Sequence, residues 1–598
     1  MSKRLSRMGW IVLVALLCLS LIALPACGGT PAEQEEEEEE EEEGIPYKND
    51  GFFIQMTIGE PETLDPAAAY DTTSGENILY AYESLLYYKG ESVGATPEEF
   101  TPLLAESWTW NQADATWTFK IRKGVKFHEG GDLTPSDVEY SFERFTVQDR
   151  AGGPAAVLNI PLLGVESYAE TTWAAVDAMV KVSGDNVVFK LSSPGMKMIF
   201  LQCAANSWGA ILDKEWCVAN GDWDGTEADI QAHYQVEPNY LWTHMNGTGP
   251  WKLNQWEQGV QLKLEKNANY WGDPAPFDWV ISQLAEEWTV RKETILAGDA
   301  DYVNVPRQYI HELDGISGLQ VHADLPGLLV FGFFMVLDID PTSPYIGTGK
   351  LDGNGIPGNF FTDKDVREGF RETFDYNTFI SQIYFGEADQ VGSPVVSGVY
   401  GFNPDAQKPV FDKAAATEHF KKAWGGDLWT KGFKFTILYN SGNDMRKAAC
   451  EILQKNLLSI NTKFQVAVQP LAWRTGILPL IKTKMATTYI IGWQADFPHA
   501  DNFIRPFMST RGVFSAYQSY GNAEIDAKIE AALLEPDPAK QLQKYYELQQ
   551  IFYDDCPGFM VAQPKSRRYF TNHIHGWYWN VMHNGEPGPL YEMSKSQS

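Results

Sequence analysis

The chain has few basic residues for its length. Lysine and arginine number 47 against 79 acidic residues, and the formal net charge of the 598-residue chain is −32. Binding to nucleic-acid phosphates needs clustered lysine and arginine, so no nucleic-acid partner is predicted. Hydrophobic residues make up 44% and charged residues 21%, which is typical of a globular protein. A chain this long predicts two or three lobes.

Cysteine, histidine and catalytic motifs are scarce. Six cysteines and ten histidines occur without a CxxC spacing, and no HExxH, GxSxG or P-loop motif is present. Residues 353–358 match GxGxxG, but Pro357 within them predicts a flexible loop. His573, His575 and His583 are predicted to be surface histidines, since a metal site needs more ligands. We therefore predict no enzyme activity, no metal and no cofactor, with an extracellular hydrolase as the alternative from another class.

The N-terminal apolar run is too short to span a membrane. It covers residues 10–24 after basic residues at Lys3, Arg4 and Arg7, whereas a spanning helix needs about 20 apolar residues. This pattern predicts a secretory signal peptide over residues 1–26.

A lipid-attachment signature follows the apolar run. Leu24-Pro25-Ala26-Cys27 resembles a bacterial lipobox, and the resemblance implies cleavage before Cys27 and a lipid attached to it. The protein is thus expected to be exported and anchored by lipid to the cell membrane, facing the periplasm or the cell exterior. Glutamates 35–43 are unbroken, and because like charges repel, residues 27–50 are predicted to form an extended tether.

Two cysteines lie close together in the body of the chain. Cys203 and Cys217 are separated by few residues, and disulfides persist in exported proteins. A disulfide between them is therefore possible, and two buried single thiols are the alternative that the sequence supports equally well.

Strand and helix patterns alternate through the body. Apolar and polar residues alternate over 117–122, which predicts a half-buried strand. Residues 134–137 (Thr-Pro-Ser-Asp) predict a capped helix start, and further helices are predicted over 444–460 and over 538–557. Interleaved helices and strands predict an α/β protein with mixed sheets.

Five stretches of the body carry a family resemblance. The most specific runs from Trp117 to Gly130 and on to a helix cap, with a strand, a glycine turn and an FHxG motif in order. The others start at Leu64-Asp65-Pro66, at Gly247-Thr248-Gly249-Pro250-Trp251, at Phe361-Thr362-Asp363 and at Gly492-Trp493. Together they resemble the extracellular solute-binding protein family 5, the group of dipeptide- and oligopeptide-binding lipoproteins of ABC importers. Departures from the family pattern occur at Pro135-Ser136, Gly369 and Thr373.

The resemblance implies a fold and its lobes. It implies a periplasmic-binding-protein type II fold of the large three-lobed variety, with mixed sheets and a hinge between two lobes that close over a ligand. Lobe I is expected to comprise residues 51–83, 193–328 and 544–598. Lobe II is expected over 84–192, and lobe III, the second ligand-closing lobe, over 329–543.

The resemblance also implies a ligand site. Peptide binders of the family place an aspartate after a Gly-Trp pair to hold the ligand's α-ammonium, and Asp496 occupies that position with Trp493 as a nearby wall. The alternative is a structural aspartate that caps a turn. Further expected contacts are Tyr70, Asp71 and Thr72. Four cations are equal candidates for a ligand carboxylate, namely Arg371, Arg474, Lys482 and Arg511.

The resemblance implies that the protein binds a ligand and does not convert it chemically. A monomer would bind a peptide-like small molecule by lobe closure and deliver it to the permease subunits of an ABC transporter. The alternative ligands on the same fold are an oligosaccharide, a nickel complex or an opine. A carboxylate at 496 favours the peptide, because a neutral sugar needs no charged partner.

Overall fold

The computed structural model describes residues 44–583 and 587–597. The predicted signal peptide, Cys27 and the glutamate run lie outside the described residues. Residues from Gly44 onward form a unit by themselves. Within the described ranges, no helix has both the length and the apolar character to cross a membrane.

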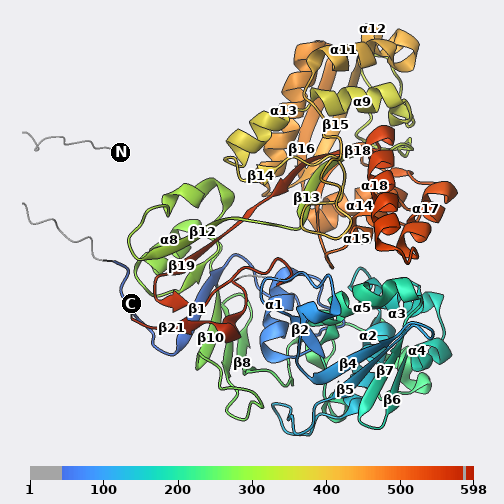
Figure 1. Cartoon of the computed structure of the whole chain (residues 1–598). Helices are drawn as coiled ribbons and strands as arrows, with labels where there is room; N and C mark the ends of the chain where they lie inside the picture. Colours follow the sequence, from blue (N-terminus) through green and yellow to red (C-terminus); the bar gives the residue numbers. More distant parts are fainter. Residues whose placement is uncertain (1–43, 584–586, 598) are drawn as a thin grey trace, which may run out of the picture. The chain divides into compact units, whose positions relative to one another are not determined.

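Lobe I is built on a seven-stranded sheet whose strands come from three parts of the chain (Figure 1). In sheet order these are β12 (Leu319–Leu325), β19 (Ser566–Thr571), β11 (Tyr302–Val303), β1 (Phe52–Thr57), β10 (Trp279–Leu284), β9 (Gln261–Lys266) and β8 (Trp251–Glu257). β1 pairs in parallel with β10 and β11, and the other pairs are antiparallel. The sheet is therefore mixed, as predicted.

Lobe II carries a four-stranded antiparallel sheet. Its order is β4 (Ala105–Asn111), β5 (Thr116–Ile121), β7 (Asn186–Lys190) and β6 (Val180–Ser183). In β5, Trp117, Phe119 and Ile121 are buried, so the predicted half-buried strand is confirmed. Helix α2 (Pro135–Gln148) begins with the predicted capping box of Thr134 and Asp137.

Lobe II continues past its predicted end at residue 192. Helix α5 (Lys197–Ala204) packs on α3 (Ala155–Leu163). The ring of Phe200 on α5 lies 5.0 Å from Phe189 on β7 and 6.1 Å from Phe142 on α2. The assignment of residues from 193 onward to lobe I is thus wrong at its start, because the apolar face of α5 completes the core of lobe II.

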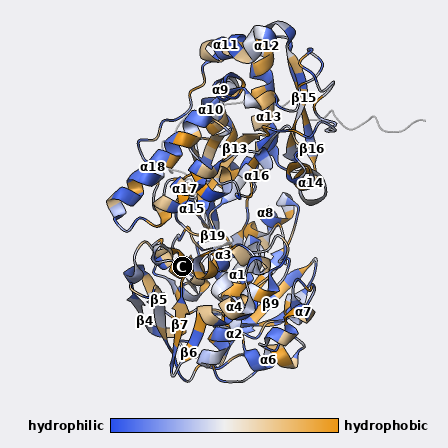
Figure 2. Cartoon of the chain, turned by 90° about the vertical axis from the view of Figure 1, so that its right-hand side faces the viewer, coloured by the Kyte–Doolittle hydropathy of each residue, from blue (hydrophilic) through white to orange (hydrophobic). Residues whose placement is uncertain are grey.

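Lobe III contains a six-stranded sheet. Its order is β14 (Ala388–Asp389), β18 (Gly558–Pro564), β13 (Leu329–Met335), β17 (Thr488–Gln494), β15 (Phe433–Asn440) and β16 (Phe464–Leu471). Its helices include α9 (Lys364–Thr373), α11 (Lys413–Lys422), α13 (Asp444–Ile460) and α18 (Pro538–Asp555). The predicted bounds of α13 and the start of α18 are confirmed. Figure 2 shows hydrophobic and hydrophilic residues interspersed along α18, whose Tyr545, Leu548 and Phe552 are buried.

Two short connections join lobes I and III. The chain passes from β12 to β13 between residues 325 and 329, and from β18 to β19 at Lys565 (Figure 1). β18 pairs with β13 and β14 of lobe III. The predicted boundary at 543/544 is therefore wrong, since the last crossing comes at Lys565. A pair of neighbouring single-chain connections is a suitable hinge.

The chain is ordered before the predicted end of the tether. Ile45 is buried, and its carbonyl lies 2.9 Å from Nε2 of His573. Tyr47 packs against the His573 ring, and Lys48 pairs with Asp299 at 2.9 Å. The tether prediction is thus wrong from Ile45 onward, because this segment contacts His573 and Asp299 of lobe I. His573 is buried rather than at the surface.

Cys203 and Cys217 are free, buried thiols, so the possible disulfide is absent. Cys203 lies on α5, close enough to Asp496 for that carboxylate's charge to act on it, and Cys217 lies on α6 (Lys214–Ala219) near Arg144. The two cysteines are close in sequence, but they lie on different helices. Cys203 lies near Asp496 and Cys217 near Arg144, so the two sulfurs do not meet.

Candidate ligand-binding site

A buried ion-pair cluster fixes the loop that begins at Asp65. Arg144 on α2 donates two hydrogen bonds of 2.8 Å to the two oxygens of Asp65, and it reaches Asp222 at 2.7 Å. All three side chains are almost fully buried. Burial alone would raise the pKa of Asp65, but the charge and hydrogen bonds of Arg144 hold this pKa below its usual value. Arg144 neutralises one of the two negative charges and hydrogen-bonds to both carboxylates, so the cluster is structural.

The same loop presents Tyr70 toward lobe III. Arg150 donates to the carbonyl of Ala68 at 2.9 Å, and the indole of Trp208 donates to the carbonyl of Ala69 at 3.1 Å. The Trp208 ring also meets Tyr70 edge-on at 5.9 Å between centroids. Two side-chain donors and a ring contact thereby set the position of the tyrosine.

Asp496 lies opposite this loop and is linked to it. The Tyr70 hydroxyl donates to Oδ1 of Asp496 at 3.1 Å, and Nδ2 of Asn502 donates to Oδ2 at 3.0 Å. Burial raises the pKa of Asp496 to about 6, although both hydrogen bonds act to lower it. No lysine, arginine or histidine of the described chain pairs with this carboxylate. Asp496 is a partly buried carboxyl group whose hydrogen-bonding side chains among the described residues are neutral.

Trp493 helps to position Asp496 through Asn502. Its ring meets Phe507 and Phe514 nearly at right angles, and its Nε1 lies 3.4 Å from Oδ1 of Asn502. The same oxygen accepts from the backbone amide of Asp496 at 2.8 Å. Trp493 thus helps to position Asn502, which in turn orients the carboxylate.

A cavity of about 540 Å³ lies between lobes I and III. Its walls include Thr72 and Thr73 of α1 (Thr72–Ala81), Phe331 of β13 and Gln494 of β17. A volume of this size suits a small ligand. Asp71 does not line it and instead caps α1 by accepting from the amide of Ser74 at 2.9 Å. Tyr70, Trp493 and Asp496 also lie outside the lining, with Asp496 two residues beyond Gln494.

The cations nearest this cavity were missed by the sequence analysis. Arg307, Lys565 and Arg568 line it, while Arg371, Lys482 and Arg511 do not. Arg371 instead donates to the carbonyl of Tyr553 at 2.7 Å, Lys482 is exposed, and Arg511 lines a different cavity. The side chain of Arg474 lies outside the described part of the chain. The missed residues belong to segments that only the fold brings together.

Arg446 is a cation near the cavity whose hydrogen bond and ring contact are with neutral groups. Its Nη1 donates to Oδ1 of Asn440 at 2.7 Å, and its guanidinium lies over the ring of Phe331 at 5.4 Å. No carboxylate of the described residues pairs with it, and its Nε is buried without a hydrogen-bond partner. Burial lowers the pKa of Arg446 to about 10, so it stays charged at neutral pH. Its neighbours Met445 and Phe331 line the cavity.

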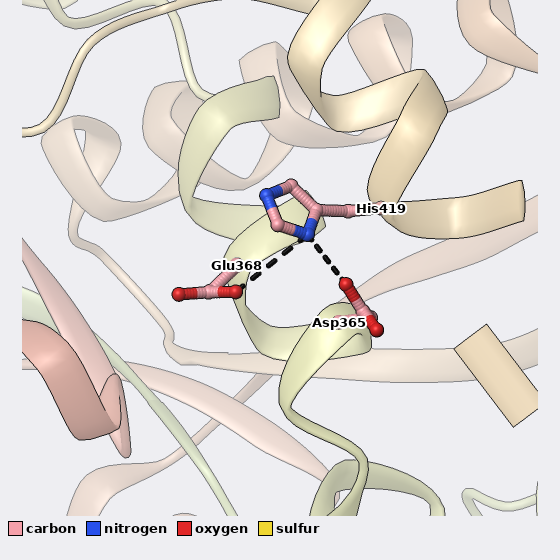
Figure 3. Close-up of side chains that lie close together, drawn as sticks. All are labelled: Asp365, Glu368 and His419. Atoms are coloured by element: carbon pink, nitrogen blue, oxygen red, sulfur yellow. Dashed lines mark hydrogen bonds and ion pairs between the residues drawn. The ribbon is translucent and has the colours of Figure 1, made fainter. Parts of the chain in front are cut away.

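One group of side chains has the composition of a metal site. Figure 3 shows His419 of α11 beside Asp365 and Glu368 of α9. Nδ1 of His419 lies 2.6 Å from Asp365 and 3.6 Å from Glu368, and Nε2 lies 3.6 Å from Glu372. These contacts tie α11 to α9. The group lies on the helices of lobe III and none of it lines the cavity between the lobes.

The three sheets and the paired connections define a type II periplasmic-binding-protein fold. The model of bacterial extracellular solute-binding proteins, family 5 (middle region) matches residues 99–515, and the chain belongs to this family.

Similar proteins cover nearly the whole chain. The probable D,D-dipeptide-binding periplasmic protein DdpA of Escherichia coli (strain K12) is 24% identical over 533 residues, which cover 88% of this chain and 90% of that protein. The structure of DppA from Helicobacter pylori in complex with the peptide STSA has a TM-score of 0.70 at 19% identity, with 91% and 98% of the two chains covered. NikZ from Campylobacter jejuni, in complex with Ni(L-His), has a TM-score of 0.68 at 16% identity, with 92% and 100% covered.

Proposed function

We propose that this protein captures a peptide-like solute between lobes I and III and delivers it to an ABC permease without chemical change. The observation that carries the proposal is Asp496, a partly buried carboxylate whose hydrogen-bond partners among the described side chains are the neutral donors Tyr70 and Asn502. An ionised carboxylate in such a place is unfavourable without a cation. The α-ammonium of a peptide would supply that cation.

A second charge supports a ligand with two charged ends. Arg446 lacks a carboxylate partner among the described residues and lies beside the cavity wall at Phe331. Arg446 contacts Asn440, the last residue of β15, and Asp496 follows the end of β17. These two strands are parallel, so Arg446 and Asp496 both lie at the same end of the sheet. A guanidinium pairs well with a carboxylate. We propose that Asp496 receives the amino end of the ligand and Arg446 receives its carboxylate.

The relatives support a peptide over a sugar. DdpA is described as a D,D-dipeptide-binding protein, and DppA was solved with the peptide STSA. A neutral oligosaccharide would leave both Asp496 and Arg446 without a charged partner. The proposed partners are therefore a peptide, an ABC permease and, through lipid on Cys27, a membrane, with the protein acting as a monomer.

Titration calorimetry with peptides of two to nine residues tests the proposal. We expect one peptide bound per chain, recovery of the same peptide intact after incubation, and a smaller radius of gyration by X-ray scattering in the bound state. Hydrolysed peptide, or saturation with no change in radius, would contradict capture by lobe closure.

The proposed anchor has its own test. Cys27→Ala is expected to move the protein from the membrane fraction to the soluble fraction or to halt processing of the precursor. A variant that stays with the membranes and is processed like the parent would refute lipid attachment at Cys27.

A further inference from the structure

A second cavity, of about 410 Å³, adjoins the cavity between lobes I and III and shares Glu76 and His583 with it. It is enclosed by the end of α1, by residues 82–88 and 101–103, by residues 270–273 and by the chain end at 588–592. Its volume is within the usual range for small-molecule sites. The proposed function makes no use of this cavity.

Aromatic rings form a large part of the walls. The cavity is lined by Tyr80, Tyr87, Trp251, Tyr270, Trp271 and Tyr591. Several of these rings are fixed by hydrogen bonds, including Trp251 to the carbonyl of Phe277 at 2.9 Å and Tyr591 to the carbonyl of Asp273 at 2.7 Å. Fixed aromatic faces carry a negative potential that attracts cations.

The charged residues of the lining all have one sign. Glu76, Glu83, Asp273 and Glu592 line the cavity, and no lysine or arginine among the described residues does. Glu83 is buried and accepts hydrogen bonds from Thr248, Tyr270 and Trp271 at 2.7–2.8 Å. Burial raises the pKa of Glu83 to about 7.

One cation, Arg122, contacts a ring of the wall from outside the lining. Arg122 stacks on the ring of Trp271 at 4.4 Å without lining the cavity. The lining itself therefore presents carboxylates and aromatic faces, a combination that favours a cation with an apolar body over an anion.

His583 is a buried polar group without a partner in this lining. Only 9% of its surface is exposed, and neither ring nitrogen has a hydrogen-bond partner within the described ranges. Its ring stacks on Tyr87 at 5.2 Å, and burial lowers the pKa of His583 to about 3, so it is neutral. The surface location predicted for His583 is thus wrong. A buried polar group without a partner costs free energy, which a ligand with a hydrogen-bonding group would recover.

We propose that this second cavity binds a small organic cation, an ammonium or guanidinium group on an apolar body. The aromatic walls and Glu83 would hold the charge, and His583 would hydrogen-bond to a polar group of the ligand. Glu76 and His583 line both this cavity and the one between lobes I and III. The cation is therefore either a free amine or the basic side chain of a solute held between the lobes.

Choline and its neutral isostere 3,3-dimethylbutan-1-ol test the charge preference on the full chain without peptide. We expect choline to bind about ten-fold more tightly by calorimetry, since a cation held on aromatic faces gains about that much over a neutral body. Glu83→Gln and, separately, Tyr87→Leu should remove most of this preference. Glu143→Gln is the matched control, because Glu143 is a buried carboxyl group of lobe II with a raised pKa that lines neither cavity.

A competition experiment separates the two sources of the cation. If a saturating lysine-containing peptide blocks choline while its alanine counterpart does not, the cation is a ligand side chain, and if neither blocks choline, it is a free amine. Equal binding of choline and the alcohol, or the same loss of preference in Glu143→Gln, would overturn the proposal. Because the choline measurements contain no peptide, they can support or refute the cation site whether or not the protein binds peptides.

Discussion

Asp65 in lobe I is fully buried and Asp496 in lobe III is partly buried, and the partners of the two carboxylates differ. Asp65 receives two charged hydrogen bonds from Arg144. Asp496 receives two hydrogen bonds from neutral groups, and burial raises its pKa to about 6. A buried charge that is compensated within the chain stabilises the fold, whereas one that lacks compensation is suited to a ligand that brings the opposite charge.

The largest effect is expected from breaking the compensated cluster. Arg144→Met leaves Asp65 and Asp222 buried without a cationic partner. It should lower the free energy of unfolding by about 3–5 kcal/mol, measured by urea denaturation. The triple variant Asp65→Asn, Arg144→Met, Asp222→Asn should recover a large part of that loss, because no uncompensated charge remains. A loss below about 1 kcal/mol in the single variant would show that the cluster is not essential.

The opposite pattern is expected at Asp496. Asp496→Asn should weaken peptide binding about ten- to a hundred-fold, because a charge-assisted hydrogen bond is lost. Its free energy of unfolding should stay equal or rise. The reason is that at neutral pH the folded chain holds Asp496 ionised against a raised pKa, which opposes folding. Clear destabilisation with unchanged affinity would make Asp496 a structural residue like Asp65.

Arg446 is expected to behave like Asp496 at the other end of the ligand. Arg446→Gln should weaken binding of a peptide with a free carboxylate about ten-fold while leaving its C-terminal amide nearly unaffected. Lys482→Gln serves as the control, since Lys482 is an exposed cation outside the cavity. Equal losses for both forms of the peptide would remove Arg446 from the site.

Peptide affinity should also depend on pH. The carboxyl of Asp496, with its pKa raised to about 6, is ionised at pH 8 and mostly protonated at pH 5. Binding of the α-ammonium needs the ionised form, so affinity should fall about ten-fold as the pH drops over this range. An N-acetylated peptide should show no such fall. A flat profile for the free peptide would mean that Asp496 carries no ligand charge.

The smallest effect is expected from Tyr70→Phe. The Tyr70 hydroxyl bond to Asp496 lowers the pKa of this carboxyl, so its removal should move the midpoint of the pH profile upward by less than about one unit. A downward shift would contradict a hydrogen bond that lowers the pKa of Asp496.

Local patterns in the sequence predicted much of the fold. The alternation in β5, the capping box of α2 and the bounds of α13 depend on neighbouring residues, and the structure confirms them. The lobe boundaries at 192 and 543 failed because sheet and core membership depends on tertiary packing. α5 joins lobe II through an apolar face, and β18 joins lobe III through pairing with β13.

The candidate site was predictable only where a motif marks it. Asp496 follows a family motif, and the structure places it against Tyr70. Arg144, Arg446 and His583 have no local signature, since their importance comes from partners that they meet or lack in the folded chain. A single arginine or histidine in a sequence does not show which carboxylate lies near it.

A thermodynamic cycle with one peptide tests the central claim most directly. The dissociation constants of a free peptide and its N-acetylated form are measured for the parent and for Asp496→Asn, which gives the coupling between the carboxylate and the ammonium. We predict that the parent prefers the free amine by about ten- to a hundred-fold and that the variant loses most of this preference. Equal preference in parent and variant would show that Asp496 does not bind the ligand's ammonium.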